Sequence, residues 1–571
     1  MTLTATVSPV SPGAGTPTGT VTFVVTGGPT LTATLSGGTA SVSTTAIPVG
    51  TSTVTATYGG DGNFTGSSGS DTQTVTQAST TTAVTTSPDP SVVGETVTFT
   101  ATVSPVSPGA GTPTGTVTFV ATNGDTTVAL TGTLSGGTTS VTTNGLVTAG
   151  TYSVTATYSG DGNFTGSVGS GTHTVSPAAT TTAVVSAPDP SVVGETVTLT
   201  ATVSPVSPGA GTPTGTVVFV ATDGPTTVTL TGTLSGGTAS VTTNGLVTAG
   251  TYSVTATYSG DSNFTGSSGS DTQTVNQAST TTAVASAPDP SVVGESVSFT
   301  ATVTPVSPGA GTPTGTVTFV IDGGGGGTLT GTLSGGTTTV STSTLDAGTH
   351  NVTATYGGDA DFSASVGTDT QTVNQASTTT AVASAPDPSV FGEAVTFTAT
   401  VAVTSPGAGS PTGTVTFVID GAGGGTLTGT VTGGTASVTT STLEPGTHNV
   451  TATYGGDANF AGSVGTDTQT VNQSATTTSV SSAPDPSTNG ETVTFTAVVA
   501  AVAPGVGIPT GTVNFTITDG VTTVNLTGTL DGLGVATVSS PLTTGVYTVT
   551  ATYVGDADFT GSTGLDTQTV S

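Results

Sequence analysis

The sequence contains no lysine, arginine, cysteine or tryptophan among its 571 residues. Without cationic side chains the chain cannot neutralise phosphates, which excludes electrostatic binding of nucleic acids and of anionic lipid surfaces. The absence of lysine also removes the phosphate-loop lysine, Schiff-base chemistry and a lysine isopeptide cross-link. The absence of cysteine removes disulfides, thiol nucleophiles and cysteine-ligated metal centres. Several classes of function are therefore excluded before any motif is considered.

Charge of either sign is scarce. Charged residues make up 5% of the chain, all of them are Asp or Glu, and the net charge is −31, whereas ordinary domains contain about 25% charged residues. Threonine, serine and glycine take the place of the missing charges, so we expect a nearly neutral surface covered with hydroxyl groups. No apolar run approaches the roughly 18 residues of a membrane span, and we expect no membrane insertion in this segment.

A repeat of about one hundred residues dominates the chain. Self-similarity at a fixed period identifies repeated structural units and takes precedence over local patterns. The motif Tyr-x-Gly-Asp-x-(Asn or Asp)-Phe begins at Tyr58, Tyr158, Tyr258, Tyr356, Tyr454 and Tyr553. We therefore divide the chain into six modules, at residues 1–76, 77–176, 177–276, 277–374, 375–472 and 473–571.

The first module is short at its front. The motif Pro-Asp-Pro-Ser occurs five times rather than six, and Thr2–Pro9 repeats Thr198–Pro205 of the third module without change. We favour the interpretation that the sequence is a piece of a longer protein. The alternative is that the first module takes its missing strand from elsewhere, although the end of the chain at Ser571 offers no spare copy.

Within a module, apolar residues alternate with hydroxyl residues. In the second module Val97, Phe99, Ala101 and Val103 are each followed by threonine or serine. This period of two is typical of a strand with one buried face, and β-branched residues favour extended backbone. Runs rich in glycine and proline, such as Ser107–Gly111, interrupt the strands. No helical period appears.

The number of strands in each module predicts the fold. Roughly seven short strands in about 100 residues indicate an immunoglobulin-like sandwich, whereas the blades of a propeller repeat every 40 to 50 residues or so. We therefore expect an all-β chain, a tandem array of six immunoglobulin-like β-sandwiches, the first one lacking its leading strand. Tyr152 would form a tyrosine corner, with Val154 and Phe119 at the positions of the usual cysteine and tryptophan.

Two segments of the second module carry a resemblance to a known family. GTPTGTVTF at Gly111–Phe119 and AGTYSVTATYSGDGNF at Ala149–Phe164 resemble the bacterial Ig-like repeat domains of large secreted and cell-surface proteins. The likeness extends over all the modules. It implies an extracellular or cell-surface, non-catalytic module that spaces, stiffens or presents something else.

The three histidines, His173, His350 and His448, lie in different modules. His350 and His448 align with Tyr152, so we expect them to fill the same corner and to bond to the backbone. His173 replaces a glutamine. A shared zinc site or a catalytic triad within one module is not expected, and we predict that the chain is not an enzyme.

The acidic residues suggest one metal site. The motif Asp-x-(Asn or Asp)-Phe spaces oxygen ligands as at the start of many calcium loops. If modules stack head to tail, Asp89 and Glu95 of one would face Asp161 of the next, and calcium would stiffen the joint. The alternative interpretation is an Asx turn and a Pro-Asp-Pro turn. The candidate ligands are Asp161, Asn163, Asp359, Asp361, Asp556, Asp558, Asp89 and Glu95. No other cofactor is expected.

A covalent cross-link is a further hypothesis. Some surface Ig-like modules join a threonine of the first strand to a glutamine of the last strand by an ester. In the third module these residues would be Thr180 to Thr182 and Gln273. The alternative is that they are ordinary polar residues of terminal strands.

We expect the chain to be an elongated, protease-resistant stalk or the repeating body of a surface filament. Short linkers such as Thr76–Ser79 favour modules nearly in line, and strands of ten residues or so make each module about 35 to 40 Å long. One alternative is an adhesin whose modules bind a glycan or protein, which would require different loops and exposed aromatic anchors. Another is a subunit that assembles with copies of itself into a fibre or sheath through exposed edge strands.

Overall fold

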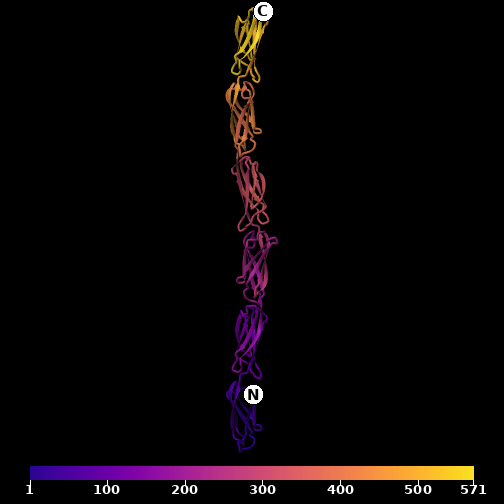
Figure 1. The fold of residues 1–571 in the computed structure, drawn as a ribbon, viewed down its shortest axis with the longest axis vertical. Coiled ribbons are helices and arrows are strands. Elements are labelled where there is room, and N and C mark those ends of the chain that lie inside the picture. Colours follow the sequence, from indigo (N-terminus) through magenta and orange to yellow (C-terminus); the bar gives the residue numbers. More distant parts are fainter. The chain divides into compact units, whose positions relative to one another are not determined.

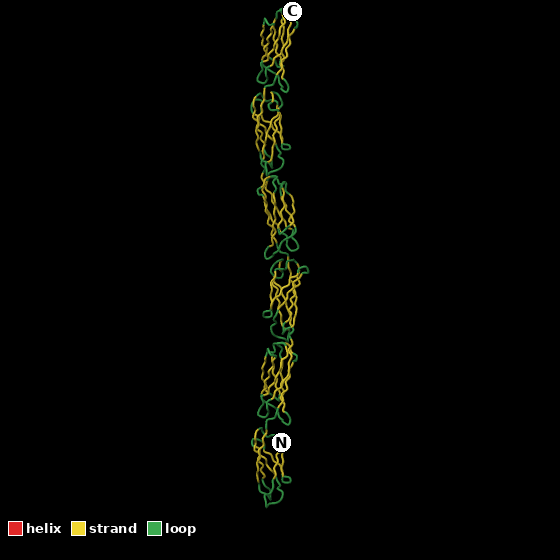
Figure 2. Tube along the Cα trace, in the orientation of Figure 1, coloured by secondary structure: helices red, strands yellow, loops and turns green.

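The computed structural model describes residues 1–571 and consists of strands, turns and loops (Figure 1, Figure 2). The prediction of an all-β chain is confirmed, and no helix is present that could cross a membrane. The chain divides into two compact units, Met1–Gln277 and Ala278–Ser571. The first unit contains the first to third modules and the second unit the fourth to sixth. The predicted boundaries between modules stay predictions.

The second module shows the arrangement that the others repeat. Its sheets have the orders β12-β9-β7 and β11-β10-β13-β14-β8, and the short β8 pairs parallel with β14. Its strands are β7 (Thr80–Ser87), β8 (Ser91–Val92), β9 (Val97–Pro105), β10 (Thr116–Thr122), β11 (Thr127–Thr133), β12 (Thr138–Thr143), β13 (Gly150–Tyr158) and β14 (Ser167–Ser176). Two facing antiparallel sheets of this kind form an Ig-like sandwich.

The third module completes the first unit with the same two sheets. Its strands are β15 (Thr180–Ala187), β16 (Ser191–Val192), β17 (Val197–Pro205), β18 (Thr216–Thr222), β19 (Thr227–Thr233), β20 (Thr238–Thr243), β21 (Gly250–Gly260) and β22 (Thr265–Asn276).

The second unit repeats the arrangement. The fourth module has the strands β23 (Thr280–Ala287), β24 (Ser291–Val292), β25 (Val297–Pro305), β26 (Thr316–Ile321), β27 (Gly327–Thr332), β28 (Thr337–Thr342), β29 (Gly348–Tyr356) and β30 (Ser365–Asn374). The fifth has β31 (Thr378–Ala385), β32 (Ser389–Val390), β33 (Val395–Val403), β34 (Thr414–Ile419), β35 (Gly425–Thr430), β36 (Thr435–Thr440), β37 (Gly446–Tyr454) and β38 (Ser463–Asn472).

The sixth module differs only in its short parallel strand, which is reduced to a bridge between Ser487 and Val570. Its strands are β39 (Thr476–Ala483), β40 (Thr492–Ala501), β41 (Thr512–Thr518), β42 (Thr523–Thr529), β43 (Val535–Pro541), β44 (Gly545–Tyr553) and β45 (Ser562–Val570).

The first module lacks the strands that correspond to β7 and β8, as predicted. Its sheets are reduced to the orders β1-β4 and β3-β2-β5-β6. The strands are β1 (Thr2–Thr6), β2 (Thr20–Val25), β3 (Thr30–Thr34), β4 (Thr39–Ser43), β5 (Gly50–Tyr58) and β6 (Ser67–Val75). One edge of each sheet is therefore open.

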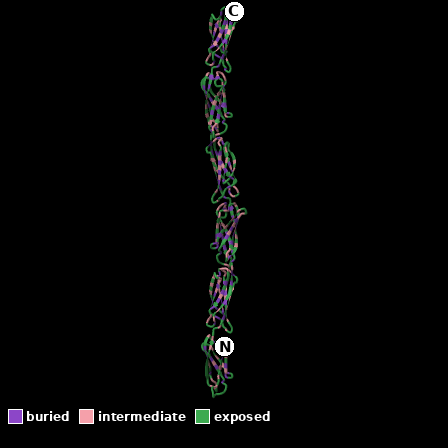
Figure 3. Cartoon of the chain, in the orientation of Figure 1, coloured by how far each residue is buried: buried purple, intermediate pink, exposed green.

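The core of each module lies between its sheets (Figure 3). In the second module Val97, Phe99, Ala101 and Val103 are buried, as their alternation predicts. The ring centroids of Phe99 and Phe119 lie 6.1 Å apart across the two sheets, within the usual range for packed aromatic rings. The core is held by burial of apolar side chains, since the chain has no cysteine.

The tyrosine corner is confirmed. The Tyr152 hydroxyl donates to the carbonyl oxygen of Thr148, four residues upstream, at 3.1 Å. In the sixth module Tyr547 bonds to the carbonyl oxygen of Thr543 at 3.0 Å. The buried ring thus fills the corner while its hydroxyl satisfies the backbone of the turn.

Candidate functional site

The loop of the Asp-x-(Asn or Asp)-Phe motif is built around one carboxylate. In the second module the Asp161 Oδ2 accepts hydrogen bonds from the backbone N–H and the hydroxyl of Thr114, both at 2.7 Å. Its Oδ1 accepts from the N–H groups of Asn163 at 2.8 Å and Phe164 at 2.9 Å. Gly160 precedes it with φ +85°, where a side chain would meet the Phe164 carbonyl. The carboxylate therefore ties the loop to the start of β10.

These hydrogen bonds also set the charge of the loop. Burial by itself would raise the pKa of Asp161, but the donors from Thr114, Asn163 and Phe164 lower the pKa to about 2. Burial and the adjacent Asp161 carboxylate raise the pKa of Tyr158 to about 12. Asp359 and Asp556 are held by their own threonines in the same way. The first aspartate of each of these loops is thus held in its ionised form at neutral pH.

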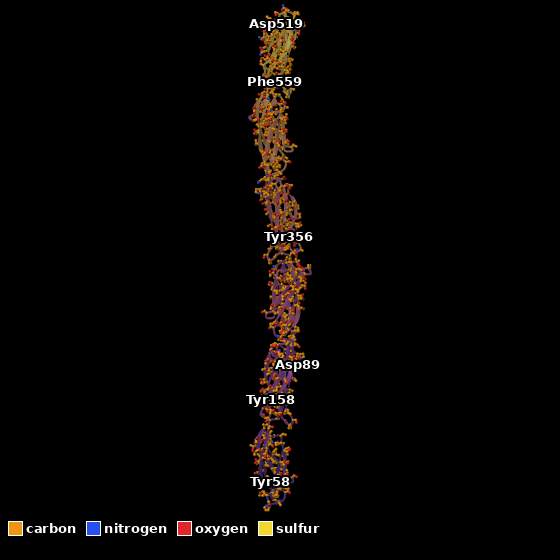
Figure 4. All side chains as sticks on the ribbon, viewed as in Figure 1. Tyr58, Asp89, Tyr158, Tyr356, Asp519 and Phe559 are labelled. Carbon is orange, nitrogen blue, oxygen red and sulfur yellow. The ribbon has the colours of Figure 1, made fainter.

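Asp89 lies at the other end of the same sandwich, as Figure 4 shows by comparison with Tyr158. Its Oδ1 accepts a hydrogen bond from the N–H of Thr174 at 3.0 Å, and the Glu95 Oε2 accepts from the N–H of Val92 at 2.9 Å. Both carboxylates are thus bound to backbone within their own module.

No group of three or more His, Asp or Glu side chains in the chain is placed to hold a metal ion. The bonds of Asp161, Asp89 and Glu95 fit the interpretation as turns. Calcium binding at the candidate ligands stays a prediction.

The linker before the second module is bound to the Asp-x-(Asn or Asp)-Phe loop of that module. The Gln77 side-chain amide donates to the carbonyl oxygen of Asp161 at 2.7 Å, and the Ala78 N–H donates to the carbonyl oxygen of Asn163 at 2.9 Å. Gln375 and Gln473 make the same contact with Asp457 and Asp556. These linkers are therefore part of the folded end of the following module.

The second and third modules meet through two backbone-centred contacts. The Ala210 N–H donates to the carbonyl oxygen of Val93 at 3.0 Å. The Ala149 N–H donates to the side-chain Oδ1 of Asn263, the second polar residue of the loop motif, at 2.9 Å. The prediction that one end of a module faces the next loop motif is right in this respect. The residues of the second module that make the contacts, however, are Val93 and Ala149, and not Asp89 or Glu95.

The fourth and fifth modules repeat this joint inside the second unit. The Ala408 N–H donates to the carbonyl oxygen of Val293 at 3.1 Å, and the Ala347 N–H donates to the Asn459 Oδ1 at 2.8 Å. The Asn459 Nδ2 in turn donates to the Asp346 Oδ1 at 2.9 Å. The asparagine side chain therefore satisfies a donor and an acceptor on the neighbouring module.

The joint between the fifth and sixth modules keeps the first of these contacts, since the Val506 N–H donates to the carbonyl oxygen of Phe391 at 3.4 Å. The rest of this joint is built differently. Phe391 and Phe559 form an edge-on pair with centroids 5.4 Å apart and an interplanar angle of 83°. Asp558 takes the asparagine position. Burial, and then the Asp556 and Glu444 carboxylates, raise its pKa. This joint thus replaces an amide with a carboxyl group and adds apolar contact.

His173 is buried beside a serine and an aspartate, which are the residue types of a catalytic triad. Its Nε2 lies 2.8 Å from the Ser91 Oγ, and its Nδ1 lies 3.0 Å from the Thr86 Oγ1 and 3.5 Å from the Asp89 Oδ1. Ser91 is 1% exposed and His173 is 0% exposed, so no substrate could reach the hydroxyl. Burial lowers the pKa of His173 despite the opposing charges of Asp89 and Glu95.

The third module shows what this position does. The Gln273 Nε2 donates to the carbonyl oxygen of Pro188 at 2.9 Å and to the Ser191 Oγ at 3.2 Å. The serine and its glutamine or histidine partner thus clasp the Pro-Asp-Pro-Ser turn to the last strand. The partners are 82 residues apart in the chain, so periodicity did not point to this pair. The only feature of the sequence that could have indicated this contact is that the Pro-Asp-Pro-Ser motif and the glutamine or histidine of the last strand recur together.

The interpretation of His350 and His448 as corner residues is confirmed. The ring nitrogens of His350 lie 2.7 and 2.9 Å from the carbonyl oxygens of Asp322 and Asp346. Those of His448 lie 2.7 Å from the carbonyl oxygens of Asp420 and Glu444. Both rings thus bond only to backbone at the position of Tyr152.

The hypothesis of a threonine–glutamine ester in the third module is wrong. Gln273 faces Pro188 and Ser191, as described above. The Thr180 and Thr182 hydroxyls instead bond to the Ser267 Oγ at 2.8 and 2.7 Å. The glutamine side chain is clasped at the turn, whereas these threonines line an earlier part of the last strand.

One family model matches nearly the whole chain. It describes the bacterial Ig-like domain (group 3) and matches residues 1–76, 84–176, 184–276, 284–374, 382–472 and 480–571. No curated protein matches the sequence.

Several solved structures are similar. The tetra-tandem repeat from the extending region of a large adhesion protein shares 20% identity and a TM-score of 0.33 over 69% of this chain and 99% of that chain. The Escherichia coli adhesin FdeC shares 17% identity and a TM-score of 0.21 over 51% and 96%. Escherichia coli alpha-2-macroglobulin shares 11% identity and a TM-score of 0.16 over 98% and 44%.

Proposed function

Because this chain belongs to the bacterial Ig-like domain family (group 3), we propose that it is a non-catalytic structural segment of an extracellular or cell-surface protein. In this role the modules are spacers that hold the parts on either side of them apart. The segment serves as a stalk or as the repeating body of a surface filament. Its partners are its own neighbouring modules, and it requires no cofactor.

The observation that carries the proposal is the recurrence of one joint. The asparagine of the loop motif accepts a backbone N–H of the preceding module at Asn263 and again at Asn459. A second hydrogen bond accompanies it in both joints. The Ala210 N–H donates to the carbonyl oxygen of Val93, and the Ala408 N–H donates to that of Val293. Each such bond contributes about 1 kcal/mol, and two bonds with a linker bound to the loop restrict rotation between neighbours. A spacer needs this restriction, whereas an enzyme or a binding module does not.

The surface supports the same role. No tyrosine or phenylalanine is among the exposed large hydrophobic residues, so the loop tips lack the aromatic anchors that dominate binding interfaces. Proteases that cleave after lysine or arginine find no site in the sequence. With few charges there is also little for salt to screen. The two alternative roles are an adhesin, whose modules bind a glycan or protein, and a subunit that assembles with its own copies into a fibre. We favour the spacer role over both.

The joint is tested by distance measurements between spin labels. The chain has no native cysteine, so cysteines introduced at the exposed Ser153 and Ser253 label successive modules cleanly. We expect a narrow distance distribution in the parent chain and a broader one in Asn263→Ala. The matched control is Asn63→Ala, which makes the same change in the loop of the first module. A distribution that is broad in the parent, or unchanged in Asn263→Ala, would contradict the proposal.

A further inference from the structure

The sixth module carries an exposed apolar surface that the other modules lack. The surface lies at the end that meets the fifth module, which the labelled Phe559 marks in Figure 4. It consists of Val506, Ile508, Leu533 and Val554, which are between 52% and 78% exposed. We call these four residues the apolar patch.

The corresponding positions of the other five modules hold small or hydroxyl side chains. The counterpart of Val506 is alanine, that of Ile508 is threonine or serine, and that of Val554 is serine or glycine. Leu533 has no counterpart, because the turn Asp531–Gly534 is one residue longer than the same turn elsewhere. Large apolar side chains have therefore been introduced at this end of one module.

Contacts between three loops bring the apolar patch together. A Cβ added to Gly534, the neighbour of Leu533, would lie 3.7 Å from the Ile508 Cγ2. The loop of Ile508 continues to the Asp556 loop, because the Thr510 N–H and hydroxyl donate to the Asp556 Oδ2 at 2.8 and 2.6 Å. The fourth patch residue lies two positions before this aspartate. The patch thus runs across neighbouring loops at one end of the sandwich.

These loops are held in place by their own hydrogen bonds. The Asp531 Oδ1 accepts from the N–H groups of Leu533 at 2.9 Å and Val535 at 3.0 Å. The Val506 N–H donates to the carbonyl oxygen of Phe391. A partner would therefore meet loops that are already ordered, so that binding costs little conformational entropy.

Carboxylates border the apolar patch. Asp531 is exposed and takes the place of a serine or threonine of the other modules. The hydrogen bonds from Leu533 and Val535 lower the pKa of Asp531, so its carboxyl is ionised at neutral pH. Asp558 replaces the asparagine of four modules, and the exposed Glu444 of the fifth module acts on it by charge. No lysine or arginine of the chain neutralises these carboxylates.

We propose that this end of the sixth module binds a segment of another protein in which large apolar side chains alternate with lysine or arginine. The apolar side chains pack on Ile508 and Leu533, and the cationic groups pair with Asp531 and with the carboxylates at the joint. Burial of aliphatic surface supplies affinity, and the charges orient the segment. A second copy of the chain does not match, because it has no lysine or arginine. This goes beyond the spacer role, since it gives one module a partner that the others do not bind.

The direct test uses the full chain and a labelled synthetic peptide of alternating leucine and lysine. We expect saturable binding by fluorescence anisotropy, together with slower hydrogen exchange confined to residues 504–511, 531–535 and 554–556 of the sixth module. A control peptide with serine in place of leucine has the same charge and should bind roughly tenfold more weakly or worse. A second control with glutamate in place of lysine should not bind.

Substitutions in the sixth module locate the site. Ile508→Thr combined with Val554→Ser introduces the residues that the second module has at these positions, so the fold is retained. This double variant should weaken peptide binding by roughly tenfold or more. The matched control is Leu565→Ser, because Leu565 is 69% exposed on β45 outside the patch and the second module has Ser170 there. It should leave binding unchanged. Asp531→Asn keeps an acceptor for the turn and should reduce the dependence of binding on salt.

Four results would overturn the proposal. The first is the absence of saturable binding by the parent chain. The second is equal binding of the peptide that contains serine, which would show attraction by charge alone. The third is an equal loss of binding in Leu565→Ser and in the double variant, which would place the contact elsewhere. The fourth is self-association of the chain that the double variant abolishes, because the occupant would then be a second copy. None of these results concerns rotation between modules, so the proposed spacer function is tested separately.

Discussion

The first and third modules place the same twenty-residue segment, Thr2–Val21 and Thr198–Val217, in two different surroundings. The central pairing is unchanged, since Phe23 lies opposite Ala56 and Phe219 lies opposite Ala256. The two modules differ, however, on the side of the missing strand. Gln273 is fully buried there, whereas Gln73 is partly exposed. The leading strand therefore closes the core of a module but does not determine the pairing of the other strands.

This difference has an energetic consequence. Burial of a valine side chain such as Val184 contributes about 1.5 to 3 kcal/mol, and the pairs with β17 add main-chain hydrogen bonds. The first module lacks both contributions. We therefore expect it to exchange its amide hydrogens faster than the third module, even where the two sequences are identical.

The largest expected effect comes from the glycine that faces the leading strand. Gly269→Val should destabilise the third module by about 3 kcal/mol, because the added side chain meets the backbone of Thr182. Gly69→Val should leave the stability of the first module nearly unchanged. Hydrogen exchange measured by mass spectrometry resolves the two modules in one chain. Equal losses of stability from the two substitutions would show that the leading strand does not cause the difference between the two modules.

The second module sharpens the comparison, because it keeps its leading strand but has His173 where the third has Gln273. Burial lowers the pKa of His173 in the folded state, so the unfolded state takes up the proton first as the pH falls. Stability should therefore fall below about pH 6.5, by up to about 1.4 kcal/mol per pH unit, and should be constant above it.

His173→Gln should remove this dependence while leaving the stability at pH 7.5 or so nearly unchanged. Urea unfolding of both chains at several pH values measures the difference. An NMR titration of the imidazole signals reports the protonation of His173 directly, since the chain has only three histidines. A His173 signal that titrates as in a free peptide would disprove the prediction.

The smallest effect should be the same in both modules. Asp61 and Asp261 hold their loops through the same four donors, including the N–H and hydroxyl of Thr18 or Thr214. These loops are built from residues outside the missing strand. Asp261→Asn should cost about 1 kcal/mol, because hydrogen bonds to a charged acceptor are stronger than those to an amide. Asp61→Asn should weaken the first module by a similar small amount, and a much larger loss there would mean that the open edge also weakens the loop.

The sequence predicted the fold because each module repeats a local pattern. Alternation at Val97 to Val103 and the turn residues between strands are read within a few positions, and the tyrosine corner depends on a contact only four residues long. The contacts that make the joints could not be read in this way. Ala149 and Asn263 are 114 residues apart, and whether Asn263 bonds its own turn or the neighbouring module depends on how two folded surfaces meet.

The candidate metal residues illustrate the same limit. Spacing identified Asp161 and Asn163 as oxygen-bearing residues of one loop, and the structure places them there. The spacing of these residues could not show that the Asp161 carboxylate accepts hydrogen bonds from backbone N–H groups. The ester hypothesis failed for a related reason, because a position on the last strand does not specify which residue of the first strand it faces.

Small-angle scattering of the full chain, with and without calcium, tests the spacer role most directly. If the modules lie nearly in line, as the short linkers lead us to expect, strands of ten residues or so predict a maximum dimension of about 200 to 240 Å. We expect that length both with and without a chelator. A compact particle of much smaller dimension under both conditions would contradict it.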